Sequence, residues 1–381
     1  MSIETILQSP EFEQLLPHEV ERKFIPVFPE EFEQFRVAAY PIEQVYLSHG
    51  DEPFSLRMRE ILQPDGSLHY EATLKSRGAT GAEGLDRIEF PTVTISQQDY
   101  LRYKSHQTPI VRKLRSEPME GIVIDFFEDG SVQLESENPM NWEEFSKQYG
   151  NRFVEVTGDA IGNSEWRAHL SFRRANDGQE ALKPRPELNA KDIVADILAQ
   201  PADRMVTAHI AGRSGSGKST IVREVYDALI ERGIEPVILS TDDYHRGATW
   251  LTSYNNAEPW TEWDAPIVYD TAAMALDLAE LRASRPIWKR TIDFSDCEPR
   301  VDGVIQPTQV VLVEGIYASS QNIAHSGDLH YEMTTPLATC VGRRLLRDMR
   351  ERPEFAEPAK SLHYMLTQAE PAYRAQERVA K

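Results

Sequence analysis

Residues 212–220 read Gly212-Arg213-Ser214-Gly215-Ser216-Gly217-Lys218-Ser219-Thr220 and fit the pattern G-x-x-x-x-G-K-[ST] at every fixed position. Glycine tolerates positive φ, so the backbone here can curl until successive N–H groups point at phosphate oxygens. Lys218 is expected to reach the β- and γ-phosphates, and Ser219 to offer its hydroxyl to Mg²⁺. The whole stretch is therefore predicted to bind the phosphates of a nucleoside triphosphate such as ATP.

The sequence on either side supports a phosphate loop. Val206, Ala208 and Ile210 predict a short buried strand before it, and an amphipathic helix follows from Ile221 and ends at Gly233. The other interpretation is a Gly/Ser-rich turn that matches by chance, but such a turn needs neither the strand nor the helix. The order strand, loop, helix therefore favours nucleotide binding.

The composition describes a globular protein with two domains. The chain has 381 residues, of which 40% are hydrophobic and 27% charged. No window approaches about eighteen consecutive apolar residues, so no membrane span is expected, and Met1–Glu4 lacks the start of a signal peptide. The two cysteines, Cys297 and Cys340, show no zinc-binding spacing, which indicates a reducing, cytoplasmic location.

The chain is acidic, with a formal net charge of −20 at pH 7. This charge argues against nucleic acid or an anionic membrane as a partner. The expected partners are nucleotides and small phosphorylated substrates, and self-association into a homo-oligomer is left open. Any polyphosphate site must then be a local basic pocket inside an acidic protein.

Two rhythms of secondary structure divide the chain. Residues 1–172 are rich in predicted strands, with turn signals such as Pro64-Asp65-Gly66 between them. Residues 173–202 read as a linker with a short helix near residues 191–198. Residues 203–381 alternate strands with helices, which predicts an α/β P-loop NTPase domain with a parallel sheet.

Acidic residues follow two further strands of the C-terminal half. The strand at 236–239 leads to Asp242, and the strand at 310–313 runs into Glu314. Since the carboxyl ends of parallel strands form the ligand-binding edge of a sheet, Glu314 is placed to hold Mg²⁺ together with the loop hydroxyl. The structural alternative for Asp242 is a turn or helix cap.

Arginines recur at three- and four-residue spacing in the predicted helix at residues 343–352. Such a row can close over a transferred phosphoryl group and offset its charge. A solvated, salt-bridged helix face is the alternative, and the phosphate loop upstream favours the first interpretation.

Residues 204–375 resemble the uridine kinase and phosphoribulokinase group of P-loop kinases. The segments that carry the resemblance are Leu239–Arg246, Val310–Ala318, Thr335-Pro336 and Arg343–Asp348, which look like the base-bearing segment, the magnesium strand and the lid helix of the group. The resemblance implies transfer of the ATP γ-phosphoryl group to a hydroxyl of a nucleoside or sugar-like acceptor. Asp242 would accept the hydroxyl proton, and Lys218 and Arg347 would stabilise the transferred group. The implied acceptor-binding residues are Tyr244, His245, Arg246, Asp264 and Asp293.

The sequence departs from the group at the acceptor site. Uridine kinases usually carry an aromatic residue where His245 stands, and the segment after Asp293 has no clear counterpart of their nucleoside-contacting histidine. Kinase chemistry is therefore better supported than uridine as the acceptor.

Charges of both signs share one face of nearly every predicted strand in the N-terminal half. Glu19, Glu21 and Lys23 alternate with Val20 and Phe24. A half-covered sheet would put the charged faces in water, whereas a closed barrel would put them in a tunnel. In a tunnel the charges need ligands, which are metal ions for the acids and phosphates for the bases. The pattern alone leaves both arrangements open.

The run Glu19-Val20-Glu21-Arg22-Lys23 resembles the E-x-E-x-K signature of the CYTH, or triphosphate tunnel metalloenzyme, superfamily, and further charged residues follow in the family's order. The resemblance covers about residues 17–170 and implies an α+β domain built on a closed antiparallel β-barrel. The implied phosphate-binding residues are Lys23, Arg57, Arg59, Lys75, Arg87, Lys113 and Arg115. The implied metal-binding residues are Glu19, Glu21, Asp125, Glu135 and Glu137, with Glu89 in support.

The two resemblances together predict a phosphotransferase joined to a phosphohydrolase. The tunnel, with Mg²⁺ or Mn²⁺, would act on a triphosphate or pyrophosphate, and tripolyphosphate, thiamine triphosphate and ATP are not distinguished. One alternative makes the tunnel a polyphosphate or nucleotide sensor for the kinase. Another makes the tunnel the sole catalyst and the P-loop half its regulator. Cyclase activity is less favoured.

Overall fold

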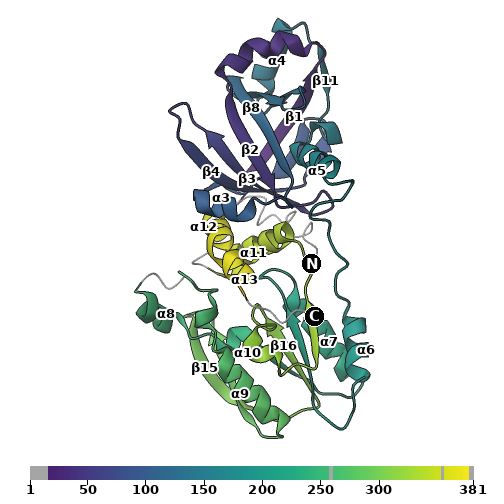
Figure 1. Ribbon diagram of the computed structural model, residues 1–381, viewed down its shortest axis with the longest axis vertical. Coiled ribbons are helices and arrows are strands. Elements are labelled where there is room, and N and C mark those ends of the chain that lie inside the picture. The colour runs from purple at the N-terminus through teal and green to yellow at the C-terminus, as the bar shows by residue number, and fades with distance from the viewer. Residues whose placement is uncertain (1–15, 257–260, 353–355, 377–381) are drawn as a thin grey trace. The chain divides into compact units, whose positions relative to one another are not determined.

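The computed structural model describes residues 16–256, 261–352 and 356–376, and it falls into two compact units. Unit 1 contains the chain up to Pro184 together with Pro336–His363, and unit 2 contains Arg185–Thr335 and Tyr364–Lys381 (Figure 1). The chain therefore leaves unit 2 after Thr335 and returns to it at Tyr364. Each unit is described by itself.

Unit 1 is built on an eleven-stranded antiparallel sheet. The strands follow the order β5-β6-β1-β10-β9-β8-β2-β3-β4-β7, and β11 pairs with β1. Near the ends of this path an isolated antiparallel bridge joins Lys75 to Glu89, and the Phe90 N–H donates to Leu74 O at 3.0 Å. The strands are β1 (His18–Pro26), β2 (Tyr40–Tyr46), β3 (Phe54–Leu62), β4 (Leu68–Ser76), β5 (Ala79–Gly81), β6 (Gly84–Ile88), β7 (Val93–Thr94), β8 (Ile110–Met119), β9 (Ile122–Phe127), β10 (Val132–Ser136) and β11 (Phe153–Glu155).

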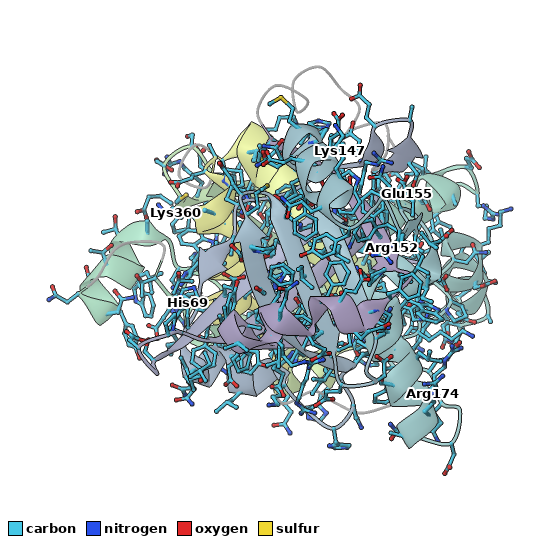
Figure 2. The ribbon with its side chains drawn as sticks, turned by 90° about the horizontal axis from the view of Figure 1, so that it is seen from above. His69, Lys147, Arg152, Glu155, Arg174 and Lys360 are labelled. Carbon is cyan, nitrogen blue, oxygen red and sulfur yellow. The ribbon has the colours of Figure 1, made fainter. Side chains whose placement is uncertain are left out.

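The apolar faces of these strands pack against helices. Phe24 of β1 stacks on Trp142 of α4 (Pro139–Gln148) with ring centroids 3.8 Å apart, inside a cluster that also contains Phe126 and Leu134. Tyr100 of α3 (Gln97–Tyr103) is fully buried as well. On the outside of the unit, exposed charged side chains form ion pairs such as Lys147–Glu143 and Arg152–Glu31. Figure 2 labels Lys147 and Arg152 among the side chains of the molecule.

A half-covered sheet would require the charged faces of the strands to lie in water, and they do not. They carry buried or nearly buried ionisable side chains. Those that are at most 9% exposed are Glu21, Lys75, Lys113, Arg115, Asp125 and Glu135. Because the strand alternates, one face supplies the apolar core and the other supplies a charged interior.

Unit 2 is an α/β unit with the predicted parallel sheet, in the order β13-β16-β12-β17. Alternate residues of β16 face opposite layers: Val310 and Leu312 join one apolar cluster, while Val311 and Val313 join the other. Helix α6 lies where a short helix was predicted. The elements are α6 (Ala190–Leu198), β12 (Val206–Ala211), α7 (Lys218–Ile230), β13 (Val237–Ser240), α8 (Ala248–Asn255), α9 (Thr271–Arg282), β14 (Ile287–Asp293), β15 (Glu298–Ile305), β16 (Val310–Gly315), α10 (Gln321–Ala324), β17 (Leu329–Glu332) and α13 (Glu370–Arg374).

Among the residues that the structure describes, no helix has the length and apolar character needed to cross a membrane.

Helix α11 (Leu337–Glu351) follows unit 2 in sequence but groups with unit 1. It contacts β3, where the side chain of Phe54 is completely buried. A Cβ placed on Gly342 would overlap the ring of Phe54. Gly342 therefore sets how closely α11 approaches the sheet. The predicted division of the chain into domains at residues 172 and 203 stays a prediction.

We expect Gly342→Ala to destabilise unit 1 even though alanine favours a helix by about 1 kcal/mol over glycine. Overpacking a buried ring costs about 1–3 kcal/mol, and the buried Phe54 has little room to move. Urea unfolding of the two proteins measures the difference. In a Phe54→Leu background the smaller side chain makes room, so Gly342→Ala should cost at most half as much free energy of unfolding as it does in wild type. A stabilising effect of Gly342→Ala in wild type would contradict this packing.

Candidate functional site

The phosphate loop connects β12 to α7, as the sequence predicted. Gly215 and Gly217 have φ of +79° and +91°, which other residues rarely adopt. At Gly212 a Cβ would lie 2.7 Å from the Cβ of Met333, so this position has no room for a side chain. Lys218 begins α7 and donates from Nζ to the Arg213 carbonyl at 2.9 Å. The loop thus presents N–H groups and a helix start, which together attract a phosphate.

The predicted acidic residues of unit 2 meet the loop at one edge of the sheet. Strand register pairs Glu314 with Ile210 on β12 and with Ser240 on β13. The Glu314 carboxylate accepts from Ser240 Oγ at 2.8 Å and from Ser219 Oγ at 3.4 Å. Burial raises the pKa of Glu314, Lys218 opposes the rise, and Asp242 adds to it. Glu314, Lys218, Ser219 and Asp242 therefore belong to one electrostatic site.

Asp242 and Asp243 follow β13 in the short helix Thr241–Tyr244. The pKa of Asp243 is raised to about 6 by burial and by the charges of Asp242 and Glu314. Three carboxylates beside one lysine leave an excess of negative charge, which a divalent cation would relieve. No three acidic, histidine or cysteine side chains in the described ranges are placed to hold a metal by themselves. Mg²⁺ commonly uses one or two carboxylates and completes its shell with phosphate oxygens and waters, so Glu314 and the Ser219 hydroxyl fit such an ion.

The predicted acceptor residues are spread over unit 2. Arg246 pairs with Asp270 at 3.2 Å. Asp264 is buried, and its main chain bonds to the Tyr317 and Tyr364 hydroxyls. Asp293 ends β14, where its carboxylate accepts from the N–H and hydroxyl groups of Ser295.

In two of the predicted acceptor residues, the polar side-chain atoms form hydrogen bonds to other groups of the protein. Tyr244 donates from its hydroxyl to Asp277 at 2.9 Å. His245 stacks on Trp263, donates from Nε2 to the Trp263 carbonyl at 3.0 Å and accepts at Nδ1 from Gly247 N at 3.0 Å. Both ring nitrogens of His245 are therefore used by the backbone, and burial lowers its pKa.

Arg347 lies on α11 and therefore in unit 1. It bonds to Asp348 at 3.3 Å, and its pKa is lowered by burial and by Arg352 and Arg344. Its Nε is buried, and within the described ranges it has no hydrogen-bond partner. The role of Arg347 in phosphoryl transfer stays a prediction.

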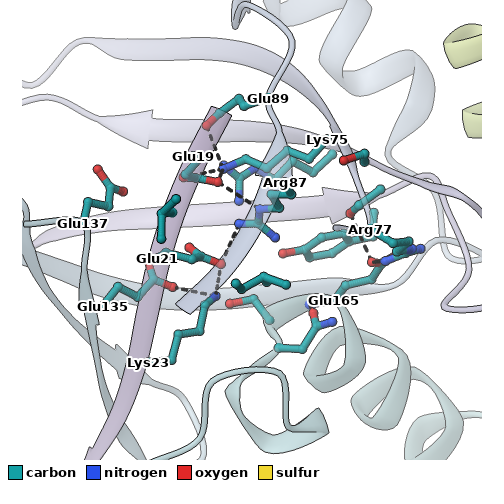
Figure 3. A pocket seen from close by; sticks show the side chains of 18 of the residues that line it. Glu19, Glu21, Lys23, Lys75, Arg77, Arg87, Glu89, Glu135, Glu137 and Glu165 are labelled. Carbon is teal, nitrogen blue, oxygen red and sulfur yellow. Dashed lines mark hydrogen bonds and ion pairs between the residues drawn. The ribbon is translucent and has the colours of Figure 1, made fainter. Parts of the chain in front are cut away.

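Unit 1 encloses a cavity of about 530 Å³. Its wall includes all seven cations that the resemblance assigned to phosphate binding. It also includes four of the five predicted metal-binding acids, Glu19, Glu21, Glu135 and Glu137 (Figure 3). Asp125 is not on this wall. It is completely buried behind it, where Lys113 and Arg115 bond to it at 2.5 and 2.7 Å and hold its pKa low against the effect of burial.

Most acids on the wall are paired with cations. The Glu19 carboxylate accepts from Lys75 at 2.7 Å and from Arg87 at 2.9 Å. Burial alone would raise the pKa of Glu19, but these two cations outweigh it and lower the pKa to about 2. Glu135 in the same way bonds to Lys23 at 3.2 Å and to Arg115 at 3.0 Å.

The pairing leaves excess charge of each sign at different places on the wall. Arg57 Nε is buried without a hydrogen-bond partner among the described residues. The pKa of Arg59 falls to about 10 because of burial and the neighbouring charges of Arg57 and Arg115. The pKa of Glu137, in contrast, is raised by burial and by Glu19 and Glu135. An anion near Arg57 and a cation near Glu137 would relieve both.

The wall residues that sequence reasoning missed include an arginine and a glutamate, Arg77 and Glu165. Arg77 continues the alternation of Lys75 beyond the end of β4, so the strand pattern could have included it. Glu165 comes from helix α5 (Ser164–Ala175), and no strand period predicts it. The two form an ion pair across the cavity wall.

A model of the Phosphoribulokinase / Uridine kinase family matches residues 208–369. A uridine kinase from Staphylococcus epidermidis is 31% identical over 150 residues, which are 39% of this chain and 70% of that protein. The chain belongs to the phosphoribulokinase/uridine kinase family. A uridine kinase from Tolumonas auensis is 32% identical over 148 residues, 38% of this chain and 68% of that protein. Membership of this family of P-loop kinases implies ATP as co-substrate.

Two solved structures show weaker likeness. A D-glycerate 3-kinase from Cryptococcus neoformans var. grubii has a TM-score of 0.35 at 13% identity over 49% of this chain and 87% of that chain. An inorganic triphosphatase has a TM-score of 0.23 at 20% identity over 39% of this chain and 93% of that chain. TM-scores this low support no conclusion about the fold or function of this chain. The family match lies outside the cavity-lining residues, so membership of unit 1 in the triphosphate tunnel superfamily stays a proposal.

The raised pKa of Asp243 gives the kinase-family unit a pH-dependent stability. Because the folded value of about 6 lies above the unfolded 3.8, this group favours folding below about pH 4 and loses that effect as the pH rises to 6. After a discount for partial solvent screening, we expect wild type to lose about 1–2 kcal/mol relative to Asp243→Asn over this range. Denaturant unfolding at several pH values measures it; a difference that does not change with pH would contradict it.

Proposed function

We propose that unit 2 transfers the γ-phosphoryl group of ATP to a hydroxyl of a small nucleoside-like or sugar-like acceptor. The observation that carries this proposal is the meeting of the phosphate loop, Glu314 and Asp242 at one edge of the sheet. Family membership supports the same chemistry, while the acceptor is left as a class. The engaged ring nitrogens of His245 leave the recognition of the acceptor to other groups, among them the buried Asp264.

The residues divide the work of phosphoryl transfer. The loop N–H groups and Lys218 would hold the β- and γ-phosphates in line and offset the charge of the transition state. Glu314 and the Ser219 hydroxyl would hold Mg²⁺, which supplies further neutralisation when bound. Asp242 would accept the proton of the attacking hydroxyl, since an alcohol is a weak nucleophile until a positioned base takes that proton.

We expect Asp242→Asn to lower the rate of phosphoryl transfer at least about 10²-fold, because the amide cannot accept the proton. Lys218→Ala should reduce it by a similar factor. The measurement is acceptor-dependent conversion of ATP to ADP over a panel of nucleosides and sugars. Asp302→Asn is the matched control, since Asp302 lies on the exposed hairpin and pairs with Lys289. If no acceptor gives a product whose formation requires Asp242, the kinase proposal fails.

The cavity favours a second activity, and we propose that unit 1 is a triphosphate tunnel. The bridge between Lys75 and Glu89 supports closure of the sheet into a barrel. The observation that carries this proposal is the charge of the wall. Arg57 Nε has no hydrogen-bond partner among the described residues, and other cations lie close to Arg59. Elsewhere on the wall other carboxylates lie close to Glu137. An isolated phosphate satisfies the cations alone, whereas a condensed phosphate with a metal ion satisfies both excesses.

The tunnel residues would promote hydrolysis of the condensed phosphate. The arginines and lysines hold its phosphoryl groups in line and neutralise the charge that develops on the leaving oxygen. Glu137, with Glu19 and Glu135 beside it, supplies carboxylate oxygens that suit Mg²⁺ or Mn²⁺, and such an ion would orient the phosphate and activate water. The ion pairs of Glu19 and Glu135 would rearrange as the phosphate takes over their cations.

We expect Lys218→Ala protein to bind inorganic tripolyphosphate with Mg²⁺ or Mn²⁺, and an added Arg57→Ala to weaken binding about ten- to hundredfold. That factor corresponds to the loss of one charge-assisted hydrogen bond. Isothermal titration calorimetry measures the affinity, and the Lys218→Ala background removes binding at the phosphate loop.

Arg112→Ala is the matched control for Arg57→Ala. Arg112 precedes Lys113 on β8, but its side chain is 52% exposed and pairs with Glu43 outside the cavity. Equal losses from both substitutions, or no binding in the background protein, would contradict the tunnel. Binding without release of phosphate would instead favour the sensor alternative, and phosphate release without any kinase product would favour the tunnel as sole catalyst.

A further inference from the structure

Helix α11 begins without a cap from its own sequence. Pro336 occupies its N-cap position and provides no side-chain cap. Instead Glu52, from the loop between β2 and β3, accepts from Thr339 N at 3.3 Å and from Thr339 Oγ1 at 3.2 Å with the same carboxylate oxygen. Glu52 is 4% exposed, and its other oxygen accepts from His49 N at 2.7 Å. The first turn of α11 therefore depends on the position of this loop.

Arg77 fixes the same loop from the cavity side. Its Nε donates to the Glu52 carbonyl at 2.8 Å, and its Nη2 donates to the His49 and Phe54 carbonyls at 2.5 and 3.2 Å. The remaining end of the guanidinium pairs with Glu165 on the cavity wall (Figure 3). Arg77 is thus shared between the cavity and the loop that caps α11.

The chain before α11 contacts the phosphate loop. Thr335, which is 1% exposed, donates from Oγ1 to the Ser216 carbonyl at 2.8 Å within unit 2. Four residues later Thr339 meets Glu52 within unit 1. A short segment of covalent chain therefore joins the hydrogen bond on the phosphate loop to the cap on α11.

From these contacts we infer that a polyphosphate in the cavity weakens nucleotide binding at the phosphate loop, and that Arg77 and Glu52 are the positioning residues that couple the two sites. The inference rests on the proposed function of the cavity and adds the regulation of one site by the other. A polyphosphate competes with the three loop carbonyls for the N–H groups of Arg77, because charge-assisted pairs of arginine with phosphate are stronger than its bonds to neutral carbonyls.

A ligand shifts a conformational equilibrium only where it contacts the two states differently. The state with Arg77 bonded to the three loop carbonyls cannot offer the same N–H groups to a phosphate, so the ligand favours the state in which the loop is released. Release of the loop removes the Glu52 cap, and the segment from Thr335 to Thr339 then holds the Ser216 carbonyl less firmly. The effect is reciprocal, so a nucleotide at the phosphate loop weakens polyphosphate binding by the same factor.

The test is calorimetric titration of the full chain with a non-hydrolysable ATP analogue, with and without saturating inorganic tripolyphosphate and Mg²⁺. Subtraction of the signal that remains in Lys218→Ala defines binding at the phosphate loop. In wild type we expect tripolyphosphate to raise the dissociation constant of the analogue at least threefold. Glu52→Ala should raise the dissociation constant of the analogue even without tripolyphosphate, and adding tripolyphosphate should not raise it further.

Two more variants separate coupling from loss of folding. Thr335→Val keeps the shape of the side chain but loses the bond to Ser216, so the response to tripolyphosphate should fall to near onefold. Thr339→Ser keeps the hydroxyl and should retain the wild-type response. A response of Glu52→Ala or Thr335→Val equal to that of wild type would overturn the inference.

The outcomes also separate this inference from the proposed tunnel. If tripolyphosphate binds and Arg57→Ala weakens it, but the analogue binds equally in its presence, the coupling is wrong and the tunnel stands. If tripolyphosphate does not bind in the Lys218→Ala background, both fail. A wild-type response that persists in Arg57→Ala, at a tripolyphosphate concentration that saturates wild type but not this variant, would show direct competition at the phosphate loop and would also overturn the coupling.

Discussion

A charge removed from water must be compensated, and this requirement shapes the interior of unit 1. The strands bury acids and bases on the same face, and neighbouring strands place each acid next to a base, as Glu19 lies between Lys75 and Arg87. The compensation is incomplete at Arg57 and at Glu137. These two uncompensated groups are the basis for the proposed ligand, a condensed phosphate accompanied by a cation.

Unit 2 meets the same requirement by other means. Its phosphate loop uses backbone N–H groups and the start of α7, which carry partial charges and need no counter-ion when the nucleotide is absent. Burial raises the pKa values of Glu314 and Asp243, and the neighbouring carboxylate of Asp242 raises both further, while Lys218 opposes the rise at Glu314. A nucleotide that brings its own Mg²⁺ suits this arrangement. Unit 2 thus relies on fixed backbone dipoles, whereas the interior of unit 1 relies on paired side-chain charges.

The sequence revealed the residues that obey a local pattern. The phosphate loop and the strands at its edge were predicted because backbone geometry dictates their spacing. Strand alternation put charged residues on one face, and the resemblance to the triphosphate tunnel superfamily assigned the seven cations to phosphate binding. Arg77 and Glu165 were missed because they lie beyond a strand end and on a helix. Asp125 obeys the alternation, yet it is buried behind the wall because Lys113 and Arg115 take up its carboxylate. Which charges meet a ligand depends on long-range packing, which a strand pattern does not contain.

Helix α11 shows the same limit at the level of whole elements. Its place in the sequence and its arginines assign it to the kinase half, but Gly342 lets it pack on Phe54 and Glu52 satisfies the N–H groups of its first turn. The first N–H groups of a helix need hydrogen-bond acceptors from outside it, and Pro336 has no side chain that could act as one. The acceptor comes from a loop that Arg77 also holds, and Arg77 pairs with Glu165 on the cavity wall, so the start of this helix and the cavity share one arginine. A single carboxylate, that of Glu52, therefore joins this helix to the loop on which Arg77 acts.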